Sequence, residues 1–492
     1  MSTLESTVKK DGMLDFSGSK TGVPFDKKFV RSFLISIVIY FGVALIDPLA
    51  LYGPLASKAL GFFIAAILFM ITSKVNLAVI AMLVATLGVM IGFYNWPAVT
   101  GRLGASQFYN MLGMIIVATG CEFTPFGRRV SYWVLKQFGQ KPIRMIILIG
   151  VTAATLSAFI SNVAIIIIFS SMVNGMLISM EEKPGKSKVG RVLMLLIPAC
   201  ACVGGMALFC GSPVGNAAAL SYMTTAIGDE SFTATFAQWA YISVPTFIIV
   251  IVPVVMIYVK WFKVKSNDFT CLPKEYYEER LKELGPLGGS EIRWVIFVVG
   301  MVSAMLLGMV TAYAAIFFAA LTMFPLIGVA PCADVLKKVP WSPLIAICML
   351  PLLGIIVTDT GFGDWFSDLV SPLFGNVSPL AFSIITTVLM AVCINLLVNA
   401  MIGTQALIMS IAGPLCVALG YNPTIVLLPA AFAASFYWCM GANQYVAINK
   451  DYGWWDMKDP IIPGLAAAIL VSIVACVVAC TLGPIFGMPL YL

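Results

Sequence analysis

Three polar residues, Ser157, Ser161 and Asn162, stand in the middle of an apolar run and are the residues best suited to bind a ligand. The run from Met145 to Met180 is uncharged, and Lys, Arg or Glu flank it on both sides. Two arms of about 16 residues would each reach ~24 Å, less than the ~30 Å of hydrocarbon in a bilayer. We therefore expect a re-entrant helical hairpin with Ser161 and Asn162 at its tip.

A hairpin tip inside the membrane can bind an anion without any Lys or Arg. The first backbone N–H groups of the second arm have no partner within their helix, and the amide of Asn162 adds a donor. A tight helical hairpin that Asn turns for local backbone reasons explains the motif equally well. Both interpretations stay open on this stretch alone.

The composition predicts a polytopic, all-α membrane protein. The 492 residues are 60% hydrophobic and 11% charged, and uncharged runs longer than 18 residues recur. The net charge of +6 comes from bases beside apolar runs in alternate loops, so we expect a lipid bilayer and no nucleic acid as partner. The 12 Cys show no paired CxxC spacing and are expected to be reduced, buried side chains. We expect no signal peptide, because the polar N-terminal segment holds no cleavable apolar region.

The apolar runs predict about 11 transmembrane helices plus two re-entrant hairpins. An amphipathic interfacial helix at 127–138 precedes the first hairpin. The uncharged run from Val192 to Gly228 is too long for one span and contains Gly211-Ser212-Pro213, so we expect a crossing broken at its middle. A short surface helix is expected at 276–284, and the other spans at 29–47, 57–73, 76–94, 107–123, 238–259, two within 294–330, and 342–358.

The basic residues predict the orientation. With a cytoplasmic N-terminus, all 29 Lys and Arg fall on the inner side except Arg102 and Lys58. The C-terminus is then outside. The segment 359–377 carries three Asp and no base, so the second half should have the opposite orientation to the first.

An internal repeat supports two inverted halves. Phe126-Gly127 and Phe138-Gly139 recur as Phe362-Gly363 and Phe374-Gly375, and Asn399 follows the second pair as Asn162 follows the first. A second broken crossing is expected in 429–445, around Gly441-Ala442-Asn443. Two inverted copies, each with an Asn-tipped hairpin and an interrupted helix, are typical of secondary transporters.

Several motifs resemble one known family. The segment Gly53–Leu68, the Phe-Gly-Arg-Arg before the hairpin, Ser161-Asn162-Val163, and Trp341 leading to Thr360-Gly361 are similar to the divalent anion:sodium symporters of the ion transporter superfamily. The resemblance covers nearly the whole chain. It implies an elevator-type homodimer in the cell membrane, with sodium as coupling ion and no other cofactor. The scaffold would comprise residues 1–124 and 263–357, and the transport part 125–262 and 358–492.

The resemblance also implies the site residues. Those assigned to substrate are Ser161, Asn162, Val163, Ser212, Asn399, Ala400 and Asn443. Those assigned to sodium are Ser157, Ser161, Asn162 and Gly211 in a first site and Asn395, Asn399, Gly441 and Ala442 in a second. The family's tips read Ser-Asn-Thr, whereas this chain has Val163 in the first and only the Asn in Val398-Asn399-Ala400. We therefore expect the second sodium site to be weak, differently built or absent.

The expected function is secondary active transport of a small organic anion of the di- or tricarboxylate class, by sodium symport. Anion exchange and proton or sodium antiport on the same fold are the alternatives; few carboxylates lie near membrane depth, which speaks against proton coupling. An enzyme is not expected, since the chain has no His, no HExxH motif and no Asp pair at membrane depth. A channel would need a ring of ligands that the sequence does not show.

The two hairpin asparagines generate a first prediction. Asn162→Ala and Asn399→Ala each remove an amide beside a charged ligand, a loss of about 1 to 3 kcal/mol of binding. Transport by reconstituted protein should collapse while expression and dimerisation persist. Normal transport by both single variants would reduce the tips to structural turns.

Overall fold

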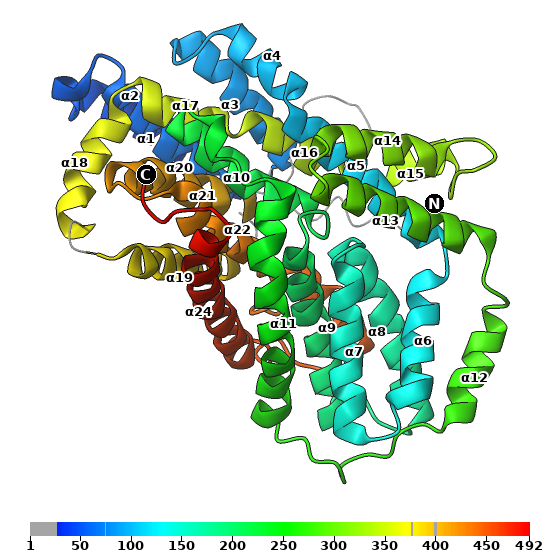
Figure 1. The fold of residues 1–492 in the computed structure, drawn as a ribbon. Helices are drawn as coiled ribbons and strands as arrows, with labels where there is room; N and C mark the ends of the chain where they lie inside the picture. The colour runs from blue at the N-terminus through cyan, green and yellow to red at the C-terminus, as the bar shows by residue number, and fades with distance from the viewer. Residues whose placement is uncertain (1–26, 74, 375–376, 398–400) are drawn as a thin grey trace, which may run out of the picture.

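The computed structural model describes residues 27–73, 75–374, 377–397 and 401–492 (Figure 1). Within these ranges the regular structure is helical, apart from an isolated β-bridge between Tyr421 and Tyr491, which confirms the all-α expectation. Eight of the described helices are long and apolar enough to cross a membrane, and six shorter apolar helices accompany them. The expected total of about 11 spans stays a prediction.

The four expected N-terminal spans are present as helices with nearly the expected bounds: α1 Lys27–Ile46, α2 Ala56–Thr72, α3 Leu77–Ile91 and α5 Ser106–Gly120. A further helix, α4 Trp96–Gly104, was not expected. Asn95 starts it, because its side-chain oxygen accepts a hydrogen bond from the Ala98 N–H at 3.0 Å and Pro97 suits the first turn.

The interfacial helix and the first hairpin follow. The amphipathic helix is α6 Phe126–Phe138, and the hairpin arms are α7 Pro142–Ser157 and α8 Asn162–Ser179. Pro142 stands in the first turn of α7, where its missing N–H costs nothing. Ser161 lies directly before α8, so the tip is where the sequence predicted it.

The first broken crossing consists of α9 Lys188–Ala207 and α10 Pro213–Ile227, with non-helical residues 208–212 between them. α9 is 94% buried along its length, and α7, α8 and α11 (Phe236–Trp261) pack around it. The centre of the molecule is therefore a helix that ends at the break, which confirms the expected interruption.

The middle of the chain differs from expectation at one helix. α12 Lys274–Glu283 was expected to lie on the surface, but Tyr277 is fully buried and α12 packs on α6. The expectation of a free surface helix was wrong because Tyr277 gives α12 an apolar face. The two spans expected next are α13 Gly289–Leu306 and α14 Thr311–Met323, and a short α15 Cys332–Lys338 follows.

The second half repeats the first incompletely. The expected span at 342–358 is interrupted at Pro351, which separates α16 Trp341–Met349 from α17 Leu352–Asp359. The second hairpin has arms α19 Pro379–Leu396 and α20 Met401–Ala418, and its tip Val398-Asn399-Ala400 lies outside the described residues. The remaining helices are α18 Phe362–Phe374, α21 Pro423–Val426, α22 Leu428–Ala433, α23 Gln444–Ala447 and α24 Ile461–Ile485.

The second broken crossing is not a copy of the first. Its non-helical stretch runs from Ala434 to Asn443, starting well before the Gly441 region that the sequence indicated, and only the four-residue α23 follows it. Phe436 and Trp438 are fully buried within this stretch. Large aromatic side chains pack the irregular backbone into the core, so the segment needs no second long helix.

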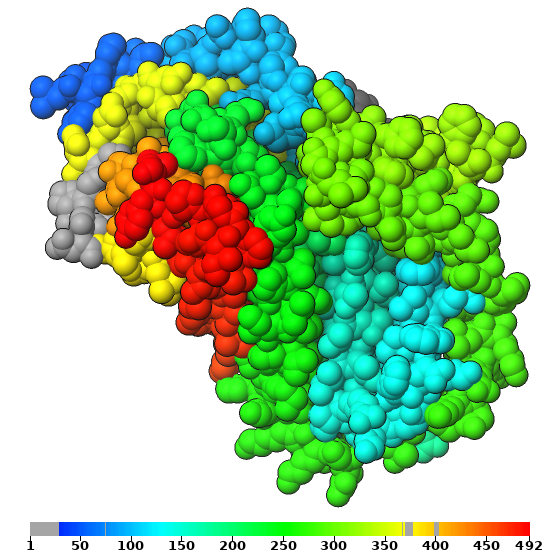
Figure 2. Space-filling model, in the orientation of Figure 1, coloured from blue at the N-terminus to red at the C-terminus, as the bar shows by residue number. Residues whose placement is uncertain are grey.

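Helices from distant parts of the chain form common layers. α5 packs on α14 and α3 on α16, and α1–α5 lie with α13–α17 across the top of Figure 1. α6–α9 and α12 descend below them. Figure 2 shows α11 exposed between the C-terminal segment in red and the cyan surface of the first hairpin region.

One buried ion pair joins these layers. Arg129 on α6 donates from Nε and Nη2 to both carboxylate oxygens of Glu291 on α13, at 2.9 and 3.1 Å. It also donates to the carbonyls of Leu284, Gly285 and Pro286. Glu291 is 1% exposed and accepts from the Gly288 N–H at 2.8 Å. The pair therefore fixes α6 and the start of α13 to each other.

Glu291→Gln should destabilise the protein by about 3 to 5 kcal/mol, because it leaves the Arg129 charge buried and unpaired. Thermal unfolding in detergent measures this. The matched control is Glu283→Gln. Glu283 hydrogen-bonds Arg280 and raises the pKa of that guanidinium, yet both side chains are exposed, so unfolding should shift little. Equal shifts for the two variants would contradict the assignment.

Candidate functional site

A cavity of about 460 Å³ lies at the tip of the first hairpin. Five residues predicted from sequence line it: Ser161, Asn162, Val163, Gly211 and Ser212. Its other lining residues come from α5 and η3, from the break and start of α10, from the segment between α15 and α16, and from α23: Ile115, Ala118, Thr119, Glu122, Pro213, Val214, Lys338, Pro340, Pro343, Gln444 and Tyr445. The hairpin tip and the first broken helix thus meet at one site.

Two helices begin at this cavity. Asn162 and Val163 open α8, and Pro213 and Val214 open α10. The side chain of Ser161, the residue before α8, makes no capping hydrogen bond. The first N–H groups of both helices carry partial positive charge without a partner in their own helix, an arrangement that favours an anion.

Asn162 has an unused donor at the same place. It is 3% exposed, and its Oδ1 accepts a hydrogen bond from Ser157 Oγ at 2.7 Å. Its Nδ2 is buried and has no partner among the described residues. Because an unpaired buried donor is costly and uncommon, this amide is suited to a ligand that accepts a hydrogen bond.

Glycines bring the broken helix against the hairpin. A Cβ at Gly205 would lie 2.3 Å from Asn162 Oδ1, and one at Gly211 would lie 2.7 Å from the Ser157 carbonyl oxygen. The Ala158 carbonyl lies at the same place and accepts from the Cys210 thiol. Oxygen atoms of Ser157, Ala158 and Asn162 therefore gather where α9 ends.

These oxygens fit a small monovalent cation. All of them are uncharged hydroxyl, amide or carbonyl atoms, which hard cations accept as ligands. Among the described residues no three His, Cys, Asp or Glu side chains cluster as a metal site would require. The first predicted cation site therefore has a suitable ligand chemistry.

The second predicted cation site is built differently. Asn395 Nδ2 donates to the carbonyls of Ala391 and Phe436 at 2.7 and 2.6 Å, and its Oδ1 accepts from the Cys439 N–H at 3.0 Å. The amide therefore fastens the irregular stretch to α19. Gly441 packs on Met457, and Ala442 is exposed.

Other second-half predictions fall apart from the cavity. Asn443 caps α23, accepting from the Tyr445 N–H at 3.2 Å, and does not line the cavity, whereas its neighbours Gln444 and Tyr445 do. Asn399 and Ala400 lie outside the described residues. The second half thus contributes α23 to the cavity rather than the residues predicted for it.

Sequence reasoning missed the amide that joins the two breaks. Asn216 is fully buried, and its Nδ2 donates to the carbonyls of Gly205 and Phe209, both at 3.2 Å. Ser435 Oγ in turn donates to Asn216 Oδ1 and contacts Ser212 Oγ at 3.3 Å. An amide one turn after Gly211-Ser212-Pro213, in an uncharged run, was the available signal.

An ion pair also lines the cavity. Lys338 Nζ donates to Glu122 Oε2 at 2.8 Å and lies 4.6 Å from the centre of the Phe123 ring. The sequence placed Lys338 in a loop and predicted a site of neutral donors only. The structure corrects this: one base lies on the cavity wall, and one carboxylate neutralises it.

A hairpin and a broken helix that meet at a cavity, in an all-helical chain with eight apolar helices of spanning length, define a multi-pass membrane transport protein. The family model described as CitMHS, citrate transporter, matches residues 67–437. The chain belongs to this family, and the resemblance to the ion transporter superfamily is confirmed.

Curated relatives agree with this class. The sodium-dependent dicarboxylate transporter SdcS of Staphylococcus saprophyticus is 25% identical over 69% of this chain and 69% of its own length. SdcS of Staphylococcus aureus strain USA300 is 23% identical over 88% of this chain and 86% of its own length. The crystal structure of the Alcanivorax borkumensis YdaH transporter covers 94% of this chain and 99% of its own, with a TM-score of 0.50 and 11% identity, and supports the fold.

The contact between Gly205 and Asn162 yields a prediction. Gly205→Ala would force a Cβ to 2.3 Å from Asn162 Oδ1 and so displace the amide from the tip. Substrate affinity should fall by about tenfold or more, the value of one hydrogen bond to a charged group, in direct binding measurements. Gly175→Ala on the same hairpin meets no atom within 4 Å and should bind normally; equal behaviour of the two variants would contradict the role of Asn162.

Proposed function

We propose that this protein is a secondary transporter of small carboxylate anions, coupled to sodium by symport across the cell membrane. The observation that carries the proposal is the meeting of two helix N-termini and the unused Asn162 amide at one cavity. A cavity of about 460 Å³ is within the usual range of small-molecule sites, about 300 to 1,000 Å³. The names of the relatives, sodium-dependent dicarboxylate transporters, and of the family, citrate transporter, point to the same substrate class.

Lys338 bears on which carboxylate is preferred. Helix N-termini and an amide suit one or two negative charges at partial-charge strength. A further carboxylate can contact Lys338 only in competition with Glu122, which already pairs with it. We therefore infer that a tricarboxylate uses this pair, whereas a dicarboxylate can bind without disturbing it.

Coupling is proposed to rest on the first cation site. Ser157 Oγ, Asn162 Oδ1 and nearby carbonyls supply oxygens there, with Ser161 at the tip. In the second half Asn395 is already engaged with backbone groups on both sides of its amide, and Val398 and Ala400 bring no hydroxyl. This supports coupling to a single sodium ion, or anion exchange, over tight coupling to several ions.

Movement is proposed to be of the elevator type, in a homodimer. One wall of the cavity comes from residues 115–122 and 338–343, in the proposed scaffold. The other comes from hairpin, break and α23, in the proposed transport part (125–262 and 358–492). Sliding of one wall along the other would carry a ligand held by the hairpin across the membrane. The N-terminus is proposed to be cytoplasmic and the C-terminus outside.

Uptake into proteoliposomes tests the function. Labelled succinate and citrate are offered under a sodium gradient, a proton gradient, and with unlabelled anion preloaded. Accumulation driven by the sodium gradient is expected. Uptake that requires only preloaded anion would establish exchange instead, and uptake driven only by protons, or of neither acid, would overturn the proposal.

Sodium coupling has its own test. Ser157→Ala with Ser161→Ala removes both tip hydroxyls and should abolish the dependence of uptake on sodium. Ser179→Ala is the control, because that hydroxyl is at the far end of α8 and bonds only the Gly175 carbonyl. Val398→Ser should strengthen sodium dependence by adding a hydroxyl to the second tip. Steep, cooperative sodium activation that survives loss of both serines would contradict the asymmetric assignment.

A further inference from the structure

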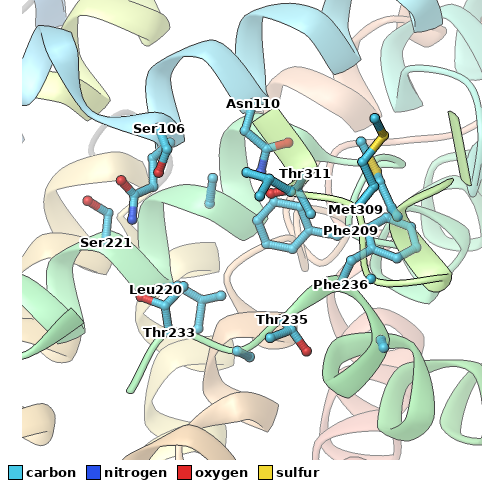
Figure 3. A pocket seen from close by; sticks show the side chains of 17 residues that line it. Ser106, Asn110, Phe209, Leu220, Ser221, Thr233, Thr235, Phe236, Met309 and Thr311 are labelled. Atoms are coloured by element: carbon cyan, nitrogen blue, oxygen red, sulfur yellow. The ribbon is translucent and has the colours of Figure 1, made fainter. Parts of the chain in front are cut away.

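A second cavity of about 390 Å³ lies at the other end of α5 (Figure 3). It shares no lining residue with the cavity at the hairpin tip. Ser106, Gln107 and Asn110 of α5 line it, whereas the later residues Ile115, Ala118 and Thr119 line the first cavity. The two cavities therefore lie along one helix, and nothing in the proposed function uses the second.

Three helices begin at this second cavity. Ser106 is the first residue of α5, Phe236 of α11 and Thr311 of α14, and all three line it. The first N–H groups of each helix lack intrahelical partners, so three partial positive charges point to the same region. No Asp or Glu lines the cavity to neutralise them within the described residues.

Its side chains supply uncharged donors. Asn110 is 8% exposed, and its Oδ1 has no partner among the described residues; the Thr233 hydroxyl is likewise buried and unpaired. Figure 3 shows Asn110 projecting from α5 toward Phe209 and Thr311. Since no printed bond fixes the Asn110 amide, it can turn its NH₂ toward an acceptor. Unpaired buried groups of this kind indicate a missing ligand.

The remaining lining suits the carbon skeleton of an organic acid. Phe209, Phe236, Met305 and Met309 supply apolar surface beside the hydroxyls and amides. An inorganic anion would leave these side chains without a partner. A short hydrocarbon chain with a carboxylate at its end fits both parts of the lining.

A basic residue stands near this cavity. Arg102, one of two bases that the orientation rule left outside, is four residues before Ser106 and lies 3.9 Å from Glu230, three residues before Thr233. Glu230 is 64% exposed in its side chain and Arg102 only 20%, so the acid is the more solvated partner. The Arg102 charge can raise the local concentration of anions.

We propose that this cavity is a second carboxylate-binding site, at the opposite end of α5 from the transport site. The carboxylate contacts the N-termini of α5, α11 and α14 with Asn110 and Thr233, and its carbon chain packs on Phe209 and Met309. The inference deepens the proposed function, because it assigns the same substrate class to a docking site on the other face of the protein.

Calorimetric titration of the full-length protein with succinate tests this. In sodium buffer, two succinate ions per chain are expected. Asn162→Ala should leave only the second site occupied. Asn110→Leu and Thr233→Val should each weaken the second site by about tenfold or more and keep the first. One succinate per chain, lost entirely with Asn162→Ala, would overturn the second site while leaving the proposed function intact.

Two controls keep the result interpretable. Thr100→Val, an exposed position on α4 that lines neither cavity, should bind two succinate ions. Asn110 and Thr233 lose no printed hydrogen bond on substitution, so the melting temperature should be unchanged. In nanodiscs of phosphatidylglycerol the second succinate should persist; its selective loss there would assign the cavity to a lipid headgroup instead and overturn the proposal. Absence of both succinate binding and uptake would instead count against the proposed function.

Discussion

The structure depends on satisfying backbone groups where two buried helices are broken. A break inside an apolar region frees N–H and carbonyl groups that water cannot reach, and each one left unpaired costs about 1 to 3 kcal/mol. Asn216 bonds the carbonyls around the first break, and Asn395 those around the second. Gln405 adds a bond from Nε2 to the Ala434 carbonyl at 2.9 Å. Buried amides therefore make the breaks, and with them the cavity, stable.

The same bonds join the two halves of the chain. Ser435 donates to Asn216 across the breaks. Asn449 donates to Ser170 on α8 and to the Met194 carbonyl on α9, and accepts from Trp455. A first-half hairpin and a second-half loop are thus held as one unit, which is what a moving transport part requires. The unequal lengths of the breaks follow from this: the second is tied down by aromatic packing, and only the first leads into a long helix whose N-terminus faces the cavity.

Much of the fold could be predicted because a bilayer imposes a length on apolar runs. The hairpin, its tip at Ser161-Asn162 and the first break all follow from uncharged runs that are too short or too long for a single span. α4 escaped prediction because nine residues give too little periodicity and its start depends on Asn95 capping. The burial of Tyr277 and the Glu122–Lys338 pair escaped because each joins residues far apart in sequence. Local pattern places polar residues within an element, but it does not say which distant element each will contact.

α5 is the common wall of both cavities, and its packing explains how they stay separate. A Cβ at Gly113 would lie 2.4 Å from the Ala315 carbonyl carbon, so α5 is held in close contact with α14. Met111 and Met114, which lie between the residues lining the two cavities, are 1% and 0% exposed. On the opposite side, Phe209 lines one cavity and Gly211 the other. The separation between the cavities thus consists of flexible methionine side chains and a five-residue non-helical segment, 208–212. Since a small displacement of that segment along α5 is enough to change which cavity it borders, the break serves both as part of the binding site and as part of the barrier.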